Sequence, residues 1–128
     1  MQILGSHHIA MYTARFAEME AFYTETLGFR VTKRWDDAGI IFIDIGGTQI
    51  ELIGKDQVKG SQQPHALGEG AGLNHLAFHV ADVDQTFQAW KDRGARVLSE
   101  PRDFQDIRIA FFADPDGNPL ELVEERAA

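Results

Sequence analysis

Two kinds of hydrophobic pattern occur along this chain, and they occur in the same order twice. Each copy starts with an alternating segment that predicts a strand, continues with apolar residues at helical spacing, and ends in three further predicted strands. The helical spacing is carried by Phe16, Met19, Phe22, Tyr23 and Leu27 in the first copy, and by Val83, Phe87 and Trp90 in the second. The predicted strands span residues 6–12, 29–36, 39–45, 48–54, 73–80, 95–100, 106–113 and 118–125.

The two copies also match residue by residue. "HHIAMYTARFAEMEAFYTETLGFRV" (7–31) resembles "NHLAFHVADVDQTFQAWKDRGARV" (74–97), which aligns His8 with His75 and Tyr12 with His79. "GTQIELI" (47–53) matches "GNPLELV" (117–123), which aligns Glu51 with Glu121. Two unrelated amphipathic units would share apolar positions, but they would rarely share a histidine and a glutamate as well. We therefore interpret the two copies as an internal repeat.

The repeat predicts an α+β fold built from two βαβββ modules. The first module is expected at 6–54 and the second at 73–126. A segment rich in Gly, Gln and Pro, 55–72, is expected to link them. With 128 residues, the whole chain (1–128) is expected to form one domain.

Composition narrows the functional classes. A net charge of −8 argues against a nucleic-acid partner, which would require a basic patch. The chain has no cysteine, which excludes disulfides, thiolate metal ligands and a thiol nucleophile. No signal peptide and no apolar run long enough to span a membrane are evident. We expect a cytoplasmic protein with no membrane partner.

The repeated histidines and glutamates form a candidate metal site. Alternation along a strand places His8 and Tyr12 on one face, and His75 and His79 on the equivalent face. Each glutamate lies between apolar neighbours in a strand that is otherwise core, where an unpaired carboxylate is costly to bury. We therefore predict that His8, Glu51, His75 and Glu121 bind a cation.

The donor set indicates which cation. Imidazole nitrogen with carboxylate oxygen suits Zn, Ni, Co, Mn or Fe, and is too rich in nitrogen for Ca or Mg. Four protein ligands leave open positions on a six-coordinate ion for water or a substrate oxygen. His7 is a competing ligand for His8, but the register of the repeat selects His8. We expect His7 and His65 to be surface residues.

The chain resembles the vicinal oxygen chelate superfamily, which includes glyoxalase I, bleomycin- and fosfomycin-resistance proteins and ring-cleaving dioxygenases. The resemblance is carried by "HHIAMYTARFAEMEAFYTETLGFRV", "IELI", "NHLAFHVADVD" and "DPDGNPLELVE", which together cover nearly the whole chain. It implies paired modules that form a curled half-barrel sheet with the metal at the base of a cleft, and it implies a homodimer.

The resemblance also implies an activity. Four ligands favour a glyoxalase I-like lyase or isomerase, which acts on a small substrate with vicinal oxygens through an enediolate. A glutamate ligand would then move the proton between carbons. Either Glu51 or Glu121 suits that role by the internal symmetry, and we favour Glu121.

The chain differs from glutathione-using members of the family at two places that bear on the choice of substrate. Glutathione-using members of the family have an arginine four residues after the first histidine ligand, where this chain has Tyr12. The loop at 100–110 lacks their basic element and offers only Arg102 and Arg108. A glutathione carboxylate would therefore lack its strongest partner. We name Tyr12, His79 and Arg108 as candidate contacts for a small-molecule substrate.

Two alternatives stay open. The first is an Fe- or Mn-dependent ring-cleaving dioxygenase, which uses two histidines and one glutamate; the fourth ligand speaks against it, as it does against fosfomycin-type thiol transfer. The second is a metal-free protein that sequesters a drug among aromatic side chains, for which the candidates are Tyr12, Trp35, Phe42, Phe104 and Phe111. The retention of all four ligands speaks against this second alternative.

Overall fold

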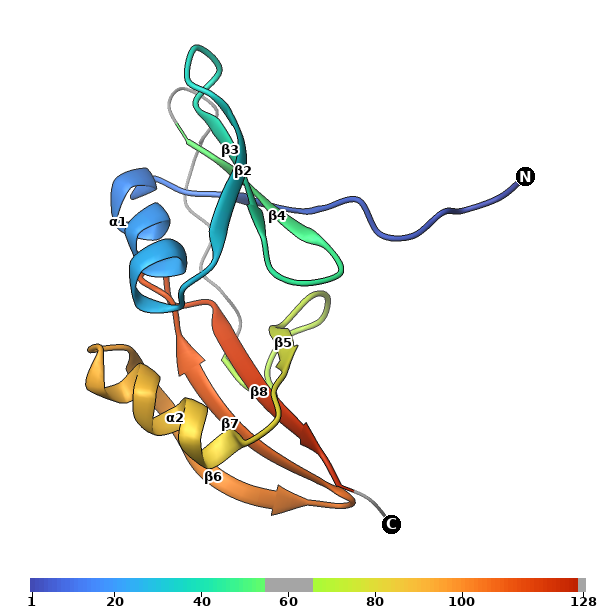
Figure 1. Ribbon diagram of the computed structural model, residues 1–128, viewed down its shortest axis with the longest axis vertical. Coiled ribbons are helices and arrows are strands. Elements are labelled where there is room, and N and C mark those ends of the chain that lie inside the picture. Colours follow the sequence, from blue (N-terminus) through green and yellow to red (C-terminus); the bar gives the residue numbers. More distant parts are fainter. Residues whose placement is uncertain (55–65, 127–128) are drawn as a thin grey trace. The chain divides into compact units, whose positions relative to one another are not determined.

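The computed structural model describes residues 1–54 and 66–126. Two compact units divide the chain, Met1–Ser61 and Gln62–Ala128. Each unit contains one four-stranded sheet and its own helix (Figure 1). The predicted linker, 55–72, falls partly outside the described residues, and His65 falls wholly outside them.

The two units have the same order of elements. The first unit contains β1 (Ile9–Tyr12), α1 (Phe16–Ala21), η1 (Phe22–Thr26), β2 (Arg30–Trp35), β3 (Ile40–Asp44) and β4 (Gln49–Ile53). The second contains β5 (Leu76–His79), α2 (Val83–Asp92), β6 (Arg96–Phe104), β7 (Ile107–Ala113) and β8 (Pro119–Glu125). The predicted α+β fold with two βαβββ modules is therefore confirmed.

Each sheet is mixed and open. The strand orders are β1-β4-β3-β2 and β5-β8-β7-β6, so the first strand of each module lies at an edge of its sheet and pairs with the last strand. β1 runs parallel to β4 and β5 runs parallel to β8, while the remaining pairs are antiparallel. This topology brings the histidine at the start of each module next to the glutamate near its end.

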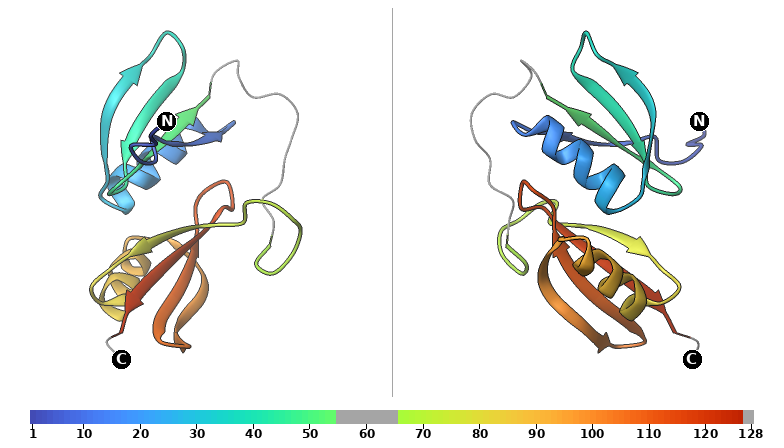
Figure 2. Two further views of the ribbon diagram at one scale, coloured as in Figure 1. Left: turned by 90° about the vertical axis from the view of Figure 1, so that its right-hand side faces the viewer. Right: turned by 60° about the vertical axis from the view of Figure 1, so that its left-hand side comes forward.

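One face of each sheet packs against the helix of its own unit (Figure 2). In the second unit, Phe112 on β7 is fully buried and stacks against the rings of Phe87 and Trp90 on α2. In the first unit, the helix buries Met19 and Tyr23, and the sheet buries Ile50 and Leu52. The side chains that alternate with these core residues lie on the opposite face, where the candidate site residues are found.

Three strand boundaries differ from the predictions by more than one residue. Strands β1 and β5 begin at Ile9 and Leu76, three residues later than predicted, because their partner strands begin only at Gln49 and Pro119. Strand β6 extends to Phe104 rather than ending at residue 100. Its pairing shifts register around Pro101, which an edge strand tolerates.

The first predicted helix is regular only over α1. It continues as the π-helical turn η1, in which the N–H of Leu27 bonds the carbonyl of Phe22 over 2.9 Å. This widened turn lets Phe22, Tyr23 and Leu27 all be buried.

Within residues 1–54 and 66–126, no helix has the length and apolar character needed to cross a membrane.

Candidate functional site

The first unit brings His8 and Glu51 into contact. Glu51 lies in the middle of β4 opposite Ala10, and His8 lies two residues before Ala10, just ahead of β1. The Nε2 atom of His8 is 3.2 Å from Oε1 of Glu51. The carboxylate side chain is only 15 % exposed, so this contact replaces much of its hydration.

The second unit contains the equivalent contact between a histidine and a glutamate. Glu121 lies opposite Ala77 on β5, and Nε2 of His75 is 3.3 Å from Oε1 of Glu121. The Glu121 side chain is 14 % exposed and that of His75 is 33 % exposed. The residue-by-residue repeat in the sequence is therefore also a repeat in side-chain geometry.

A buried phenylalanine supports each pair. Phe42 faces Glu51 in the antiparallel ladder, and Phe111 faces Glu121 in the same way. The ring edges meet the adjacent histidine rings nearly at right angles, with centroids 5.6 Å apart in the first unit and 5.2 Å in the second. Both phenyl rings are nearly buried, so they hold the imidazoles in place and keep water from one side of each carboxylate.

The donor chemistry of the two pairs fits a divalent cation. A neutral imidazole Nε2 that carries a lone pair and a carboxylate oxygen are both acceptors, so a proton or a metal ion has to lie between them. Ligand atoms about 2.0–2.2 Å from one ion at near-right angles lie about 3 Å apart. The contacts of 3.2 and 3.3 Å are compatible with such a shared cation.

Tyr12 and His79 occupy equivalent positions at the last residues of β1 and β5. They lie opposite Ile53 and Val123, on the face of each sheet that carries the histidine–glutamate pair. Tyr12 is 61 % exposed, and His79 is also exposed. Both side chains are therefore accessible to solvent, and their role as substrate contacts stays a prediction.

Arg108 does not lie on the face of the sheet that carries the His75–Glu121 pair. It is on β7 with Phe112 and its guanidinium reaches α2, so it is on the helix-covered face, opposite to Glu121. Nε and Nη2 of Arg108 donate to the two carboxylate oxygens of Asp84 at 2.6 and 2.9 Å, and Nη1 donates to Asp103 at 3.1 Å. The geometry gives Arg108 a role in holding α2 and β6 to the sheet, rather than one beside Glu121.

The ion pair between Arg108 and Asp84 also shifts the pKa of both partners. The hydrogen bonds from Arg108 lower the pKa of the Asp84 carboxyl, and the same hydrogen bonds raise the pKa of Arg108. Asp84 therefore stays ionised to a lower pH than a free aspartate does.

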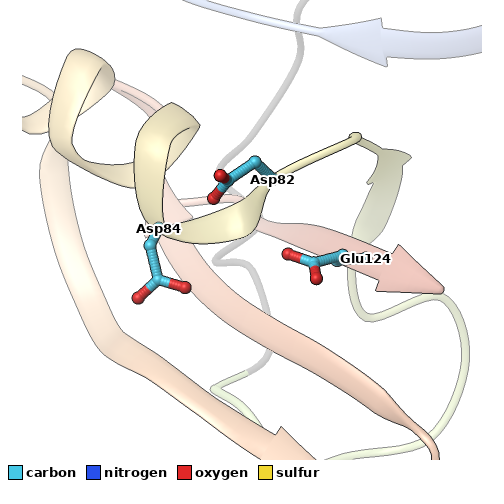
Figure 3. Close-up of side chains that lie close together, drawn as sticks. All are labelled: Asp82, Asp84 and Glu124. Atoms are coloured by element: carbon cyan, nitrogen blue, oxygen red, sulfur yellow. The ribbon is translucent and has the colours of Figure 1, made fainter. Parts of the chain in front are cut away.

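A second acidic group surrounds the start of α2 and was not expected from the sequence. In the part of the chain that the structure describes, Asp82, Asp84 and Glu124 are the only three metal-ligating side chains with ligand atoms within 4.8 Å of one another (Figure 3).

Each of these carboxylates already has a partner. Asp82 accepts from the N–H of Gln85, and Glu124 accepts from the N–H of Val83. Asp84 is bound by Arg108. We interpret this group as the cap of α2 and assign no metal to it.

Comparison with known proteins gives the family. Residues 5–122 match the family model described as "Glyoxalase/Bleomycin resistance protein/Dioxygenase superfamily". The chain is 34% identical to "Uncharacterized protein YwkD" of Bacillus subtilis (strain 168), over 98% of this chain and 100% of that protein.

Relatives with named activities are more distant. "Probable lactoylglutathione lyase" of Synechocystis sp. (strain ATCC 27184 / PCC 6803 / Kazusa) is 28% identical, over 80% of this chain and 82% of its own length. "Metallothiol transferase FosB" of Staphylococcus epidermidis is 26% identical, over 94% of this chain and 83% of its own length.

Solved structures agree with the fold. The crystal structure of SMU.1112c is similar with a TM-score of 0.79 at 30% identity, over 96% of this chain and 100% of that chain. A glyoxalase family protein from Enterococcus faecalis gives 0.73 at 30% identity, over 92% of this chain and 95% of that chain. The repeated fold, the matched family model and these relatives show that the chain belongs to the Glyoxalase/Bleomycin resistance protein/Dioxygenase superfamily.

Proposed function

We propose that this protein is a divalent-metal-dependent, glyoxalase I-like lyase or isomerase that acts on a small substrate with vicinal oxygens. The observation that carries the proposal is the duplicated contact between a histidine Nε2 and a desolvated glutamate. Duplication of both residue types and of their geometry is not expected of two unrelated surface ion pairs.

The proposed ligands are His8, Glu51, His75 and Glu121. Their two imidazoles and two carboxylates suit Zn, Ni, Co, Mn or Fe. When bound, such an ion supplies Lewis-acid polarisation of substrate oxygens. The phenylalanines beneath the pairs exclude water on one side, which strengthens electrostatic interactions at the carboxylates.

The glutamates have the chemistry needed for proton transfer. A carboxylate oxygen takes a proton from a hydroxyl-bearing carbon next to a carbonyl, which gives an enediolate. It returns that proton to the former carbonyl carbon, while the hydroxyl proton passes to the oxygen of that carbon. Both protons are therefore conserved and no oxidant is needed. We assign this step to Glu121, with Glu51 as the symmetric alternative.

The substrate is proposed to be a small molecule other than a glutathione adduct. Tyr12 stands where glutathione-using members have an arginine, and Arg108 is occupied by Asp84 and Asp103. A phenol and an imidazole, Tyr12 and His79, remain beside the pairs to contact substrate oxygens. We further propose a homodimer, as the family resemblance implies.

Activity of metal-depleted protein reloaded with each candidate metal tests the proposal. Methylglyoxal, which forms a hydrate in water and a hemithioacetal with glutathione, is supplied with and without glutathione, and the product is analysed for deuterium after turnover in heavy water. We expect metal-dependent turnover without a strict need for glutathione. Solvent deuterium should enter the carbon that receives the proton only to the extent that the protonated carboxyl exchanges with solvent before it returns the proton. Glu121→Gln should abolish turnover, while Glu125→Gln, an exposed change on the same strand, should not.

Failure of every metal to support turnover of small 2-oxoaldehydes would contradict the proposal. Oxygen uptake with catechols would favour the dioxygenase instead, and drug binding by metal-depleted protein would favour the sequestering alternative.

Metal-dependent thiol transfer is a second candidate, because the "Metallothiol transferase FosB" relative spans 94% of this chain. Loss of free thiol in the presence of fosfomycin and metal would support it over proton transfer.

A further inference from the structure

The residue before each proposed ligand histidine contacts the other nitrogen of that imidazole. Oδ1 of Asn74 is 2.8 Å from Nδ1 of His75, and Nδ1 of His7 is 2.8 Å from Nδ1 of His8. Asn74 and His7 are equivalent in the repeat but differ in chemistry. An amide oxygen only accepts hydrogen bonds, whereas a neutral imidazole nitrogen either donates or accepts.

The amide of Asn74 has a defined orientation. Its Nδ2 donates to the carbonyl oxygen of Ala66 over 3.0 Å, so the amide oxygen has to be the atom that faces His75. Nδ1 of His75 must therefore carry the hydrogen. In the neutral ring, Nε2 is then the nitrogen with the lone pair, and it points at Glu121.

His7 sets no such constraint on His8. If Nδ1 of His7 accepts, His8 has its hydrogen on Nδ1 and its Nε2 lone pair faces Glu51. If Nδ1 of His7 donates, the hydrogen of a neutral His8 moves to Nε2, where Glu51 accepts it. The second arrangement satisfies both contacts of His8 without a metal, whereas the first needs a cation between Nε2 and Glu51, so His8 has two competing tautomers.

We propose that Asn74 and His7 are positioning residues that select the tautomer of the adjacent histidine, Asn74 strictly and His7 loosely. The inference rests on the proposed metal-binding role of the two pairs. With its tautomer selected in this way, the His75–Glu121 pair is arranged to bind a cation before the cation arrives. The His8–Glu51 pair is less well arranged, because His8 has two tautomers. A fixed partner on the second nitrogen orients a ligand imidazole and raises its basicity.

Nitrogen NMR of the histidine rings tests the inference without a metal. The metal-free protein is studied at a pH at which the imidazoles are neutral, and the shifts of Nδ1 and Nε2 report which nitrogen carries hydrogen. We expect a larger Nδ1–H fraction in His75 than in His8, because only His75 has a fixed acceptor at Nδ1. Asn74→Ala should shift His75 toward Nε2–H, because the acceptor at Nδ1 is then lost while Glu121 still faces Nε2.

Three variants separate tautomer selection from general structure. Asn74→Asp keeps the acceptor and loses the donor to Ala66, so His75 should stay Nδ1–H. His7→Asn gives the first pair the chemistry of the second and should raise the Nδ1–H fraction of His8. Asn74→His is the reverse exchange and should make His75 a mixture.

Metal affinity, measured by competition with a chelator, is the second readout. Asn74→Ala should weaken binding by about 10–100-fold, as loss of such a partner does elsewhere. Asn74→Asp should restore most of the affinity, and His7→Asn should bind as tightly as wild type or more tightly. A His75 tautomer that is the same in wild type and Asn74→Ala would overturn the inference.

The two readouts distinguish this inference from the proposed function. If the tautomers respond as expected but no metal binds to wild type, positioning stands and the metalloenzyme fails. If metal binds tightly and Asn74→Ala changes neither tautomer nor affinity, the metal site stands and positioning is overturned.

Discussion

Replacing Glu121 by leucine should make the metal-free protein more stable while removing its response to metal. The carboxylate is 14 % exposed and lies between Leu120 and Leu122 along β8, with Phe111 across the ladder. Without a metal, its partial desolvation costs about 1–3 kcal/mol of folding free energy. Loss of the contact to the partly exposed His75 costs about 0–1 kcal/mol in return.

The substitution also adds partly buried apolar surface on the face of the sheet that carries the site. Glutamate already buries its methylenes, so leucine adds the equivalent of about one methylene, or about 0.8 kcal/mol. The free energy of unfolding should therefore rise by about 1–3 kcal/mol. For a chain of this size, each kcal/mol corresponds to a rise in Tm of about 4 °C.

Thermal and urea unfolding of metal-depleted protein measure this change. Glu51→Leu, at the equivalent position of the first unit, should also raise the free energy of unfolding of the metal-free protein. Glu125→Leu, an exposed position on β8, should change stability by less than about 0.5 kcal/mol. Added metal should raise the Tm of wild type and of Glu125→Leu, but not that of Glu121→Leu.

A loss of more than about 1 kcal/mol in metal-free Glu121→Leu would refute this reasoning. It would mean that the histidine and glutamate stabilise the fold as an ion pair with a protonated imidazole. A cation-binding role would then not be needed to explain why a carboxylate lies there.

Three further substitutions test the fold around the site. Asp114→Ala should cost about 2–4 kcal/mol in urea unfolding, because this buried carboxylate accepts hydrogen bonds from three N–H groups of the turn that follows it, and Asp114→Asn should cost less. Gly54→Ala should cost about 1–3 kcal/mol, because the added Cβ would lie 2.6 Å from Cδ2 of Phe16; an unchanged Tm would contradict this. Asp84→Asn should be less stable than wild type above about pH 4, because the pKa of Asp84 is lowered by Arg108 in the folded state. That difference should vanish as the pH falls through the lowered pKa, and a difference that persists in acid would contradict the ion-pair explanation.

The sequence identified His8, Glu51, His75 and Glu121 as candidate ligands because their positions follow from periodicity and repetition. Alternation places His8 on the same face as Ala10, and the repeat identifies the strand that carries Glu51. Neither inference requires knowledge of how far the strands extend. For this reason the candidates could be named even though β1 begins at Ile9, after the histidine rather than before it. The contacts that join them as two histidine–glutamate pairs come from the structure.

Arg108 shows what the sequence could not provide. Its type and its loop suggested a substrate contact, but its face depends on the register between β7 and β8. Ala110 pairs with Leu122 and Phe111 with Glu121, so Phe111 is on the site face and Arg108 is on the other. A shift of one residue would exchange the two faces, and no pattern within β7 alone fixes that register.

The tautomer-selecting contacts could not be predicted either. Asn74 and His7 are polar residues ahead of a strand, and the sequence gives no sign of which nitrogen they reach. Only the contact of Asn74 with the carbonyl of Ala66 determines which amide atom faces His75.

Metal content of protein purified without added metal, and again after loading and dialysis, tests whether His8, Glu51, His75 and Glu121 bind a metal. We expect stoichiometric retention of a divalent transition metal by wild type, and its loss in both His75→Ala and Glu121→Ala. The same metal content in wild type and in both variants, or no retained metal after loading with each of Zn, Ni, Co, Mn and Fe, would contradict this expectation.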